Sequence, residues 1–442
     1  MGYPQRLEHL RQRLRADTGP NIRLDKATSN LFRNRDTSHS GLDVRNFQHV
    51  LSVDPATRSI ETEGMVTYED LTDAALEYGM MPAVVPQLKS ITIGGAVGGI
   101  GIESSSFRYG LPHETVHEMD VLLGNGDVIT CRPDNEYRDL FLGLANSYGT
   151  LGYILRLEIE GIPVKPYVRL TYIHYTSAQD LFKAVDESCR GSYDFVDGVV
   201  FAPGDHYLVL GEFCDEAPYT SDYTYLDIFY RSIRSRSEDY LTVRDYLWRW
   251  DTDWFWCSKN LFAQNPLIRR LLGRKRLNSI TYQKVMRWNT RAGLTRQLNR
   301  LTGIHRESVI QDVDIPIENA PEFLQFFDQE IGIRPVWICP ARHDGARGAY
   351  PLFPMRKDTL YINFGFWDGI RSQQAYPTGH FNRLIEEKVA ELGGIKSLYS
   401  QSFYPREEFS EIFGGDEYQA LKAKYDPDNK LKDLYQKCVL GH

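Results

Sequence analysis

Five glycines lie within eight residues, from Gly94 to Gly101, and this cluster limits what the segment can form. Glycine costs about 1 kcal/mol per position inside a helix, so we expect a loop here and not a well-formed helix. Because these residues lack side chains, their main-chain N–H groups can approach a phosphate or a flat ring closely. The alternative is a tightly packed turn that holds no ligand.

Two common nucleotide-binding motifs are absent from the sequence. The glycine segment is not G-x-G-x-x-G, and no strand–G-x-G-x-x-G–helix unit with an acidic residue about 20 positions later occurs, which argues against a Rossmann site. No G-x-x-x-x-G-K-[ST] sequence occurs, so a P-loop is excluded. Six scattered cysteines, without a C-x-x-C pair or zinc spacing, argue against a structural metal and against a disulfide framework.

Length and composition indicate an ordinary multidomain protein. The chain has 442 residues, 42% of them hydrophobic and 25% charged, which is enough for two to three domains. We expect a boundary near residues 162–166, where Pro163 and Pro166 follow an alternating strand. No apolar stretch approaches the roughly 20 residues of a spanning helix, and no signal sequence follows Met1, so we expect a cytoplasmic location.

One segment differs from the rest of this acidic chain. The net charge is −8, yet residues 254–306 contain twelve Lys or Arg and no Asp or Glu. Four of the seven tryptophans lie at positions 248, 250, 254 and 256. Trp and basic side chains favour the interface of an anionic bilayer. We therefore expect residues 222–306 to be a membrane-facing insertion. Its residues 248–306 should contact an anionic membrane surface at the inner face of the membrane. The alternative is a solvated basic helix whose tryptophans pack in the core. We find no nucleic-acid recognition module and expect no such partner.

A succession of short motifs runs through the whole chain. The motifs are Thr28-Ser29-Asn30, Leu51-Ser52-Val53-Asp54-Pro55, Glu63-Gly64, Thr92-Ile93-Gly94-Gly95, Arg108-Tyr109-Gly110, Gly124-Asn125-Gly126-Asp127, Gly149-Thr150-Leu151-Gly152 and Tyr425-Asp426-Pro427-Asp428-Asn429. This order resembles the vanillyl-alcohol oxidase, or PCMH-type, superfamily of FAD flavoproteins. Within it the chain is most similar to the 24-dehydrocholesterol reductase (Diminuto/Seladin) group, through Gly101–Ser106 with Tyr109-Gly110, Ile338-Cys339-Pro340, Leu360-Tyr361-Ile362 and Arg406-Glu407-Glu408-Phe409.

The resemblance implies an α+β fold in three parts. A two-subdomain PCMH-type FAD-binding domain should span residues 1–163, and an α+β substrate (cap) domain with an antiparallel sheet should span residues 164–400. A helical segment, residues 401–442, should return to the FAD domain. FAD should be bound non-covalently, because the loop from Lys26 to Leu31 lacks the His that tethers flavin in related oxidases. His39 lies later, in a strand-like segment, and is a weaker candidate for a tether.

The resemblance also assigns FAD contacts, residue by residue. The glycine segment and the residues after it should hold the cofactor, the loop at 28–30 should meet the pyrophosphate, and the turn at 149–153 should lie along the adenosine. The residues are Thr28, Ser29, Asn30, Thr92, Ile93, Gly94, Gly95, Val97, Gly98, Gly99, Gly101, Ile102, Glu103, Ser104, Ser105, Tyr109, Gly110, Gly149, Thr150, Gly152 and Tyr153.

The chemistry that the resemblance implies is the reduction of a carbon–carbon double bond, with NADPH as a transient electron donor. Such a reduction needs a hydride at one carbon and a proton at the other, so we expect a tuned acid near the flavin. Glu103 is one candidate, because burial would raise its pKa; the alternative is a structural carboxylate. Tyr361 and Asn363 alternate on an expected strand and share one face. His343 and His305 are weaker candidates, because a lone His is more often structural.

The sequence thus predicts an FAD enzyme that reduces a double bond in a lipid, either a sterol side chain or an unsaturated or methylene-bearing fatty acyl chain. One alternative is an FAD oxidase or dehydrogenase of the same superfamily, acting on an alcohol or a saturated acyl chain. The other is a non-catalytic lipid-binding protein that keeps only the fold.

Overall fold

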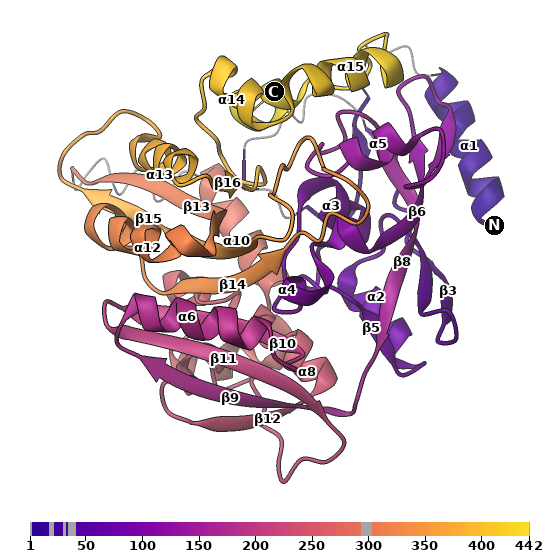
Figure 1. Ribbon diagram of the computed structural model, residues 1–442. Coiled ribbons are helices and arrows are strands. Elements are labelled where there is room, and N and C mark those ends of the chain that lie inside the picture. The colour runs from indigo at the N-terminus through magenta and orange to yellow at the C-terminus, as the bar shows by residue number, and fades with distance from the viewer. Residues whose placement is uncertain (1, 17–21, 30–31, 34–40, 293–302, 442) are drawn as a thin grey trace.

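Two antiparallel sheets divide the protein (Figure 1). A computed structural model describes residues 2–16, 22–29, 32–33, 41–292 and 303–441. The first sheet is built from strands before residue 164, and the second from strands after residue 166. The predicted α+β class is therefore confirmed, and the expected boundary falls in the short link between the last strand of one sheet and the first strand of the other.

The first sheet has six strands, in the order β3-β4-β8-β6-β7 with β5 paired to β8. Its strands are β3 (Val50–Asp54), β4 (Ser59–Glu63), β5 (Met80–Pro82), β6 (Val116–Leu122), β7 (Val128–Cys131) and β8 (Tyr153–Pro163). A short parallel pair, β1 (Leu24–Asp25) and β2 (Leu42–Asp43), lies beside it. The helices of this half are α1 (Tyr3–Ala16), α2 (Tyr68–Leu76), α3 (Ile93–Gly99), α4 (Ser106–Tyr109) and α5 (Arg138–Gly143).

The second sheet has eight strands, in the order β12-β9-β11-β10-β14-β15-β13-β16, and every pairing in it is antiparallel. The strands are β9 (Tyr167–Tyr175), β10 (Phe195–Ala202), β11 (Asp205–Cys214), β12 (Glu238–Thr242), β13 (His305–Pro316), β14 (Val336–Arg342), β15 (Leu360–Ser372) and β16 (Ile395–Lys396). Helices α6 (Ala178–Cys189), α12 (Ala320–Phe326) and α13 (His380–Glu391) cover its outer face (Figure 1). The inner face is left to pack against the first half of the protein.

The glycine segment forms a short helix, which corrects the loop expected there. Helix α3 runs from Ile93 to Gly99, and its apolar side chains are buried in the core. At Gly94 a side chain would meet the main chain of Gly64, with the Cβ only 2.7 Å from the Gly64 oxygen. Tertiary packing of this kind overrides the weak helix propensity of glycine. At Gly94 the missing side chain serves close packing of two main-chain segments, as in the alternative of a tightly packed turn.

The tryptophans of the basic segment are buried, so the expectation that they face a membrane is wrong. Trp248, Trp250, Trp254 and Trp256 are at most 5% exposed. They belong to the chain between α8 (Val243–Leu247) and α9 (Pro266–Leu272), where Trp254 and Phe255 have positive φ values of 46° and 57°. The ring of Phe255 packs against Trp337 and Trp367 of the cap sheet, and that of Trp256 packs against Trp367. None of the helices in the described part of the chain combines the length and the apolar character needed to cross a bilayer.

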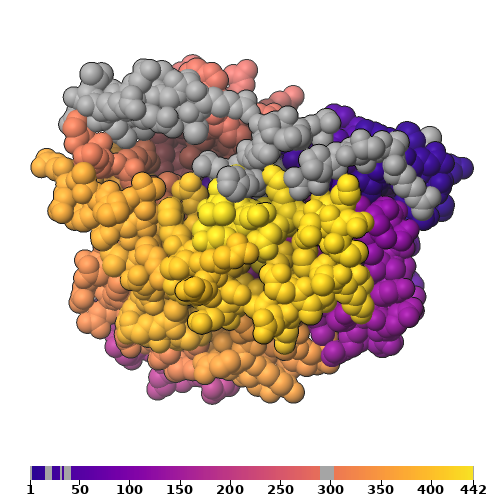
Figure 2. Space-filling view, turned by 90° about the horizontal axis from the view of Figure 1, so that it is seen from above, coloured from indigo at the N-terminus to yellow at the C-terminus, as the bar shows by residue number. Residues whose placement is uncertain are grey.

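The C-terminal segment returns to the first half of the protein. Helices α14 (Arg406–Ile412) and α15 (Gly415–Tyr425) lie above the junction of the two halves, and in Figure 2 this segment, in yellow, spreads across that junction. The Lys422 ammonium group is buried and donates hydrogen bonds to the carbonyl oxygens of Thr150 and Leu431, at 2.9 and 2.6 Å. The last residues of the chain thereby reach the same region as the glycine helix.

Candidate functional site

A cavity of about 310 Å³ lies where the glycine helix α3, the inner face of the cap sheet and the C-terminal segment meet. One wall comes from α3 and the turn at residues 147–154, and another from β13, β14 and β15. Lys432 and Lys437 reach it from the C-terminal segment. Residues that are more than 400 positions apart in the sequence therefore line one space.

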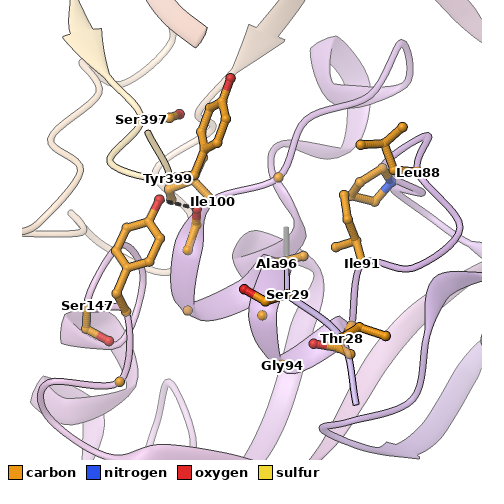
Figure 3. A pocket seen from close by; sticks show the side chains of 18 of the residues that line it. Thr28, Ser29, Leu88, Ile91, Gly94, Ala96, Ile100, Ser147, Ser397 and Tyr399 are labelled. Atoms are coloured by element: carbon orange, nitrogen blue, oxygen red, sulfur yellow. Dashed lines mark hydrogen bonds between the residues drawn. The ribbon is translucent and has the colours of Figure 1, made fainter. Parts of the chain in front are cut away.

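The glycines give one wall an open main-chain surface. Gly94, Gly95 and Gly98 line the cavity, and a Cβ at Gly98 would find its nearest neighbour, a methyl group of Ile154, at 3.9 Å. Thr28 and Ser29 lie beside this helix, as the close view shows (Figure 3). A flat or extended ligand can therefore contact the main chain of α3 without displacing a side chain.

Aromatic side chains form the opposite end. The wall there is built by Phe32, Trp254, Phe255, Trp337, Trp367 and Tyr399. The rings of Phe32 and Trp254 stack at 5.6 Å between centroids, and those of Phe255 and Trp367 lie 4.3 Å apart. Such a wall excludes water and accepts flat or apolar groups.

Several buried polar atoms on the wall have no hydrogen-bond partner within the described residues. They include Ser29 Oγ, the side-chain amide oxygen and nitrogen of Gln87, and Asn363 Oδ1. Buried polar groups are normally paired, so these atoms indicate where a polar ligand is held. Lys26, Lys432 and Lys437 line the same cavity and bring positive charge. The wall thus offers an apolar slot for a ring system together with cations and polar groups for a pyrophosphate, and these residues fit FAD.

Two carboxyl groups face the cavity from β13. Asp312 and Asp314 stand two residues apart on the strand and therefore share a face, and both line the cavity. Burial raises the pKa of Asp312 to about 8 and that of Asp314 to about 7. The Asn363 amide donates to Asp314 Oδ1 at 3.2 Å, while Asp312 Oδ1 has no partner among the described residues. They are the only carboxyl groups among the described residues of the lining.

Glu103 lies behind the cavity wall and not on it. Its side chain is fully buried and accepts a hydrogen bond from the Ser104 hydroxyl, and Arg249 lies 3.8 Å away. Burial raises its pKa, and although Arg249 opposes this shift, the pKa still reaches about 7. Arg249 in turn binds Asp197 at 2.9 Å, and the Trp337 indole nitrogen donates to the same carboxylate at 3.1 Å. This network connects to the cavity through Trp337.

The other three predicted catalytic residues, Asn363, Tyr361 and His343, do not lie at one site. Asn363 is buried and lines the cavity. Tyr361 is also buried, but its hydroxyl accepts a hydrogen bond from the Arg356 main chain at 3.0 Å and does not reach the cavity. His343 pairs with Glu114 at 2.5 Å, away from the lining. Burial lowers the pKa of His343, but the hydrogen bond and charge of Glu114 outweigh it, so the pKa is raised overall. Asp344 completes a cluster of metal-ligand types with these two residues, outside the cavity.

The structure sorts the predicted FAD contacts into three groups. The residues that line the cavity are Thr28, Ser29, Thr92, Gly94, Gly95, Gly98, Gly99, Gly101, Ile102, Gly149, Gly152 and Tyr153. Asn30 lies outside the described residues, as does His39. The remaining residues sit behind the wall: Ile93, Val97, Glu103, Ser104, Ser105, Tyr109, Gly110 and Thr150.

The segment after the glycine helix joins the two halves of the protein. The Ser104 hydroxyl pairs with the Tyr246 hydroxyl at 2.8 Å, and its carbonyl accepts from the Val196 main chain at 2.9 Å. The Ser105 hydroxyl donates to the Ala83 carbonyl at 2.8 Å. Residues 103–110 therefore connect the cap strands to the first half, and the small polar side chains of Ser104 and Ser105 make these contacts.

Sequence reasoning missed most of the cap side of the cavity. The aromatic cluster was visible in the sequence but was assigned to a membrane surface, and Trp337, Trp367 and Tyr399 were not singled out. Asp312 and Asp314 carried a usable signal: two carboxylates that alternate with Val313 and Ile315 in a strand are costly unless their face meets a polar site.

The comparisons with known proteins agree with this geometry. Residues 16–132 match the family model described as an FAD binding domain. The Delta(24)-sterol reductase of Homo sapiens is 28% identical over 407 residues, which cover 89% of this chain and 76% of the human protein. The Delta(24)-sterol reductase homolog of Caenorhabditis elegans is 27% identical over 421 residues, covering 89% and 78%. The Delta(24)-sterol reductase of Arabidopsis thaliana is 25% identical over 441 residues, covering 91% and 77%.

The class is now defined: this chain is an FAD-dependent oxidoreductase with a PCMH-type FAD-binding domain, and the predicted resemblance is confirmed. FAD is its cofactor. More narrowly, the chain is similar to the Delta(24)-sterol reductases, which it matches over about nine-tenths of its length.

Proposed function

We propose that this protein reduces a carbon–carbon double bond in a lipid, with NADPH as the electron donor. The observation that carries the proposal is the cavity itself, which has an open glycine surface on one side and an aromatic, water-excluding end on the other. The relatives named above are reductases of a sterol double bond by name, which supports the reaction class. The lipid would be a sterol side chain or an unsaturated or methylene-bearing acyl chain.

The residues on the walls would divide the work. Bound FAD, once reduced, supplies a hydride. Gly94, Gly95 and Gly98 would let it lie against the main chain, while Ser29 and Gln87 would bind its polar groups. Trp254 and Trp367 would enclose the apolar lipid chain and keep water from the reacting carbons.

An absorption spectrum followed by stopped-flow kinetics tests this function. We expect a yellow protein that NADPH bleaches without oxygen and that a Δ24-unsaturated sterol in detergent, or a phospholipid with an unsaturated acyl chain, reoxidises. Bleaching by an alcohol or a saturated acyl chain, with reoxidation by oxygen, would support the oxidase alternative instead. A colourless protein that takes up no added FAD would support the non-catalytic alternative and contradict the proposal.

We also propose that the protein attaches peripherally to an anionic membrane on its cytoplasmic face, through exposed residues of the basic segment 248–306 and not through its four buried tryptophans. Large apolar side chains are exposed along the basic segment: Phe262 by 75%, Leu267 by 66%, Leu271 by 82% and Trp288 by 61%. Exposed cations accompany them on α9, on the turn after it and on α10 (Ser279–Ala292), namely Arg270, Lys275, Arg276 and Lys284. Apolar side chains flanked by cations match an anionic bilayer, where each cation contributes about 1 kcal/mol.

Co-sedimentation with vesicles tests the attachment. The double variant Leu267→Ser/Leu271→Ser and the charge variant Arg270→Ser/Lys275→Ser/Arg276→Ser should both lose binding to phosphatidylserine-containing vesicles. Arg269 is left intact because it is fully buried and binds Asp253 at 2.5 Å. Tyr78→Ser, at an exposed apolar residue elsewhere, is the matched control. Equal partitioning of all the variants and the parent protein would refute the attachment.

A further inference from the structure

The reaction proposed above requires a proton donor. Each predicted candidate either lies outside the cavity lining or lacks an acidic proton. Glu103 and His343 lie outside the lining, the Tyr361 hydroxyl is bound to main chain, and Asn363 carries no acidic proton. The donor must touch the substrate carbon, must carry a proton at neutral pH and must be able to recover it. We therefore consider the two carboxyl groups of β13, Asp312 and Asp314.

We propose that Asp312 is the general acid that protonates the substrate carbon, with Tyr399 and Asp314 as positioning residues. This assignment rests on the proposed function. Asp312 lines the cavity, and its Oδ1 atom has no partner among the described residues, so this oxygen is available to a ligand. The Tyr399 hydroxyl hydrogen bonds to the same carboxyl group and accepts in turn from the Trp367 indole nitrogen at 2.8 Å. Trp367 thus holds Tyr399, and Tyr399 in turn orients Asp312.

The neighbouring strand leaves room for this carboxyl group. Asp312 pairs in register with Gly365 of β15, and a Cβ at Gly365 would lie 2.7 Å from Asp312 Oδ1 and 2.6 Å from the Trp367 ring. Any side chain at Gly365 would therefore displace either the acid or the aromatic wall. The absence of a side chain at this position fits a site that keeps an acid beside an aromatic surface.

The surroundings keep Asp312 protonated. The side chains that shift its pKa are Tyr399 from the segment after β16 and Asp314 from its own strand, and no Lys, Arg or His of the described residues contributes to the shift. An interior carboxylate without a cation is unfavourable, so the neutral acid is preferred, and the neighbouring Asp314 raises the pKa of Asp312 further. Its pKa of about 8 means that most molecules carry the proton at pH 7.

The step balances in atoms and electrons. One alkene carbon accepts the hydride that the bound, reduced cofactor supplies. The π electron pair of the double bond then forms a C–H bond at the other carbon with the proton of Asp312. The O–H bond of Asp312 breaks, and its electron pair stays on the carboxylate. Asp312 recovers a proton from solvent before the next turnover, and the Tyr399 hydroxyl holds the carboxylate in place meanwhile.

The test compares Asp312→Asn with the parent holoenzyme in separate half-reactions. FAD binding and anaerobic bleaching by NADPH should be unchanged, whereas reoxidation by a Δ24-unsaturated sterol should slow by at least about 100-fold. Asp368→Asn is the matched control, since Asp368 is a carboxylate on β15 that binds Lys259 at 2.8 Å and lies outside the cavity lining. Reoxidation of Asp312→Asn at the parental rate would overturn the assignment and leave the proposed function standing. A parent enzyme that no olefin reoxidises would overturn both.

A second measurement needs no turnover. Infrared spectra of the parent protein, with and without bound FAD, should show a protonated carboxyl band at pH 7 that disappears as the pH rises through about 8. Asp312→Asn should lose the part of the band that titrates at about 8 and keep only the weaker signal of Asp314 and Glu103, whose pKa values are about 7, whereas Asp368→Asn should retain the full band. A parent spectrum without any carboxylic acid band at pH 7 would contradict a protonated Asp312.

Discussion

The hydroxyl group of Tyr148 donates a hydrogen bond to the main-chain carbonyl of Gly99, with an oxygen–oxygen distance of 2.7 Å. The bond joins the last residue of the glycine helix to the turn that precedes β8. It also explains why residue 99 lacks a side chain, because a Cβ there would lie 2.9 Å from the Tyr148 ring. Both residues line the cavity, so the bond fixes the shape of its glycine wall.

Tyr148→Phe should weaken FAD binding without unfolding the protein. The ring remains to pack against Gly99, and only the hydrogen bond is lost, which is worth about 0.5–1.5 kcal/mol, or roughly a 2- to 10-fold rise in the FAD dissociation constant. Fluorescence titration of the apoprotein with FAD measures this change. Tyr78→Phe, at an exposed tyrosine, should bind FAD as the parent does. An unchanged constant for Tyr148→Phe would show that the wall does not depend on this bond.

Two glycines of α3 should respond differently to the same substitution. Gly94→Ala places a methyl group 2.7 Å from the Gly64 oxygen and should lower the free energy of unfolding by about 1–3 kcal/mol. Gly98→Ala has 3.9 Å of space and gains helix propensity, so its stability should be at least that of the parent. Its methyl group enters the cavity wall, so FAD affinity should fall. Chemical unfolding and FAD titration of both variants separate the two effects, and equal FAD affinity of Gly98→Ala and the parent would contradict a cofactor lying on this helix.

The sequence predicted the first half of the protein better than the second. The glycines, the polar residues at 28–29 and the turn at 149–153 converge on the cavity because their motifs are local, and each is read from a few adjacent residues. The helix at Ile93–Gly99 could not be predicted, since it depends on the main chain of Gly64 and on Tyr148, which are distant in sequence.

The cap side required information that the sequence pattern does not carry. A cluster of Trp and Arg has the same composition on a membrane surface and in a core, and the outcome depends on what covers it. Here Trp254 and Phe255 turn inward, and Arg269 is neutralised by Asp253, while Leu267 and Leu271 of the same segment remain exposed. Asp314 meets Asn363, and Asp312 meets Gly365, only through strand pairing across about 50 residues, which no local motif records.

Lys422→Met should destabilise the junction of the C-terminal segment with the first half. The Lys422 ammonium group binds Asp426 at 2.5 Å in the interior, and its removal leaves a buried carboxylate without a cation, which typically costs about 3–5 kcal/mol. Lys424→Met is the control: that side chain is 53% exposed and binds Asp139 at the surface, where an ion pair contributes about 0–1 kcal/mol. Chemical unfolding measures the stability of both variants.

FAD retention should fall with Lys422→Met as well, because Lys432 and Lys437 on the same segment line the cavity. Equal stability of the two variants would show that the buried pair contributes no more than the surface pair.

Glu103→Gln should become more stable relative to the parent as the pH rises. The folded protein raises the pKa of Glu103 from 4.5 to about 7, mainly through burial, so the folded state holds this proton where the unfolded state has released it. The stabilisation from the protonated form is complete below pH 4.5 and is lost as the pH increases to about 7. Glutamine resembles the protonated acid and does not titrate. The difference in the free energy of unfolding between Glu103→Gln and the parent should therefore grow by up to about 3 kcal/mol between pH 5 and pH 8.

Urea unfolding at several pH values measures this difference, with Glu330→Gln at an exposed position as the control. A difference that stays constant with pH would mean that Arg249 holds Glu103 ionised throughout, and the buried network would then be a permanent ion pair.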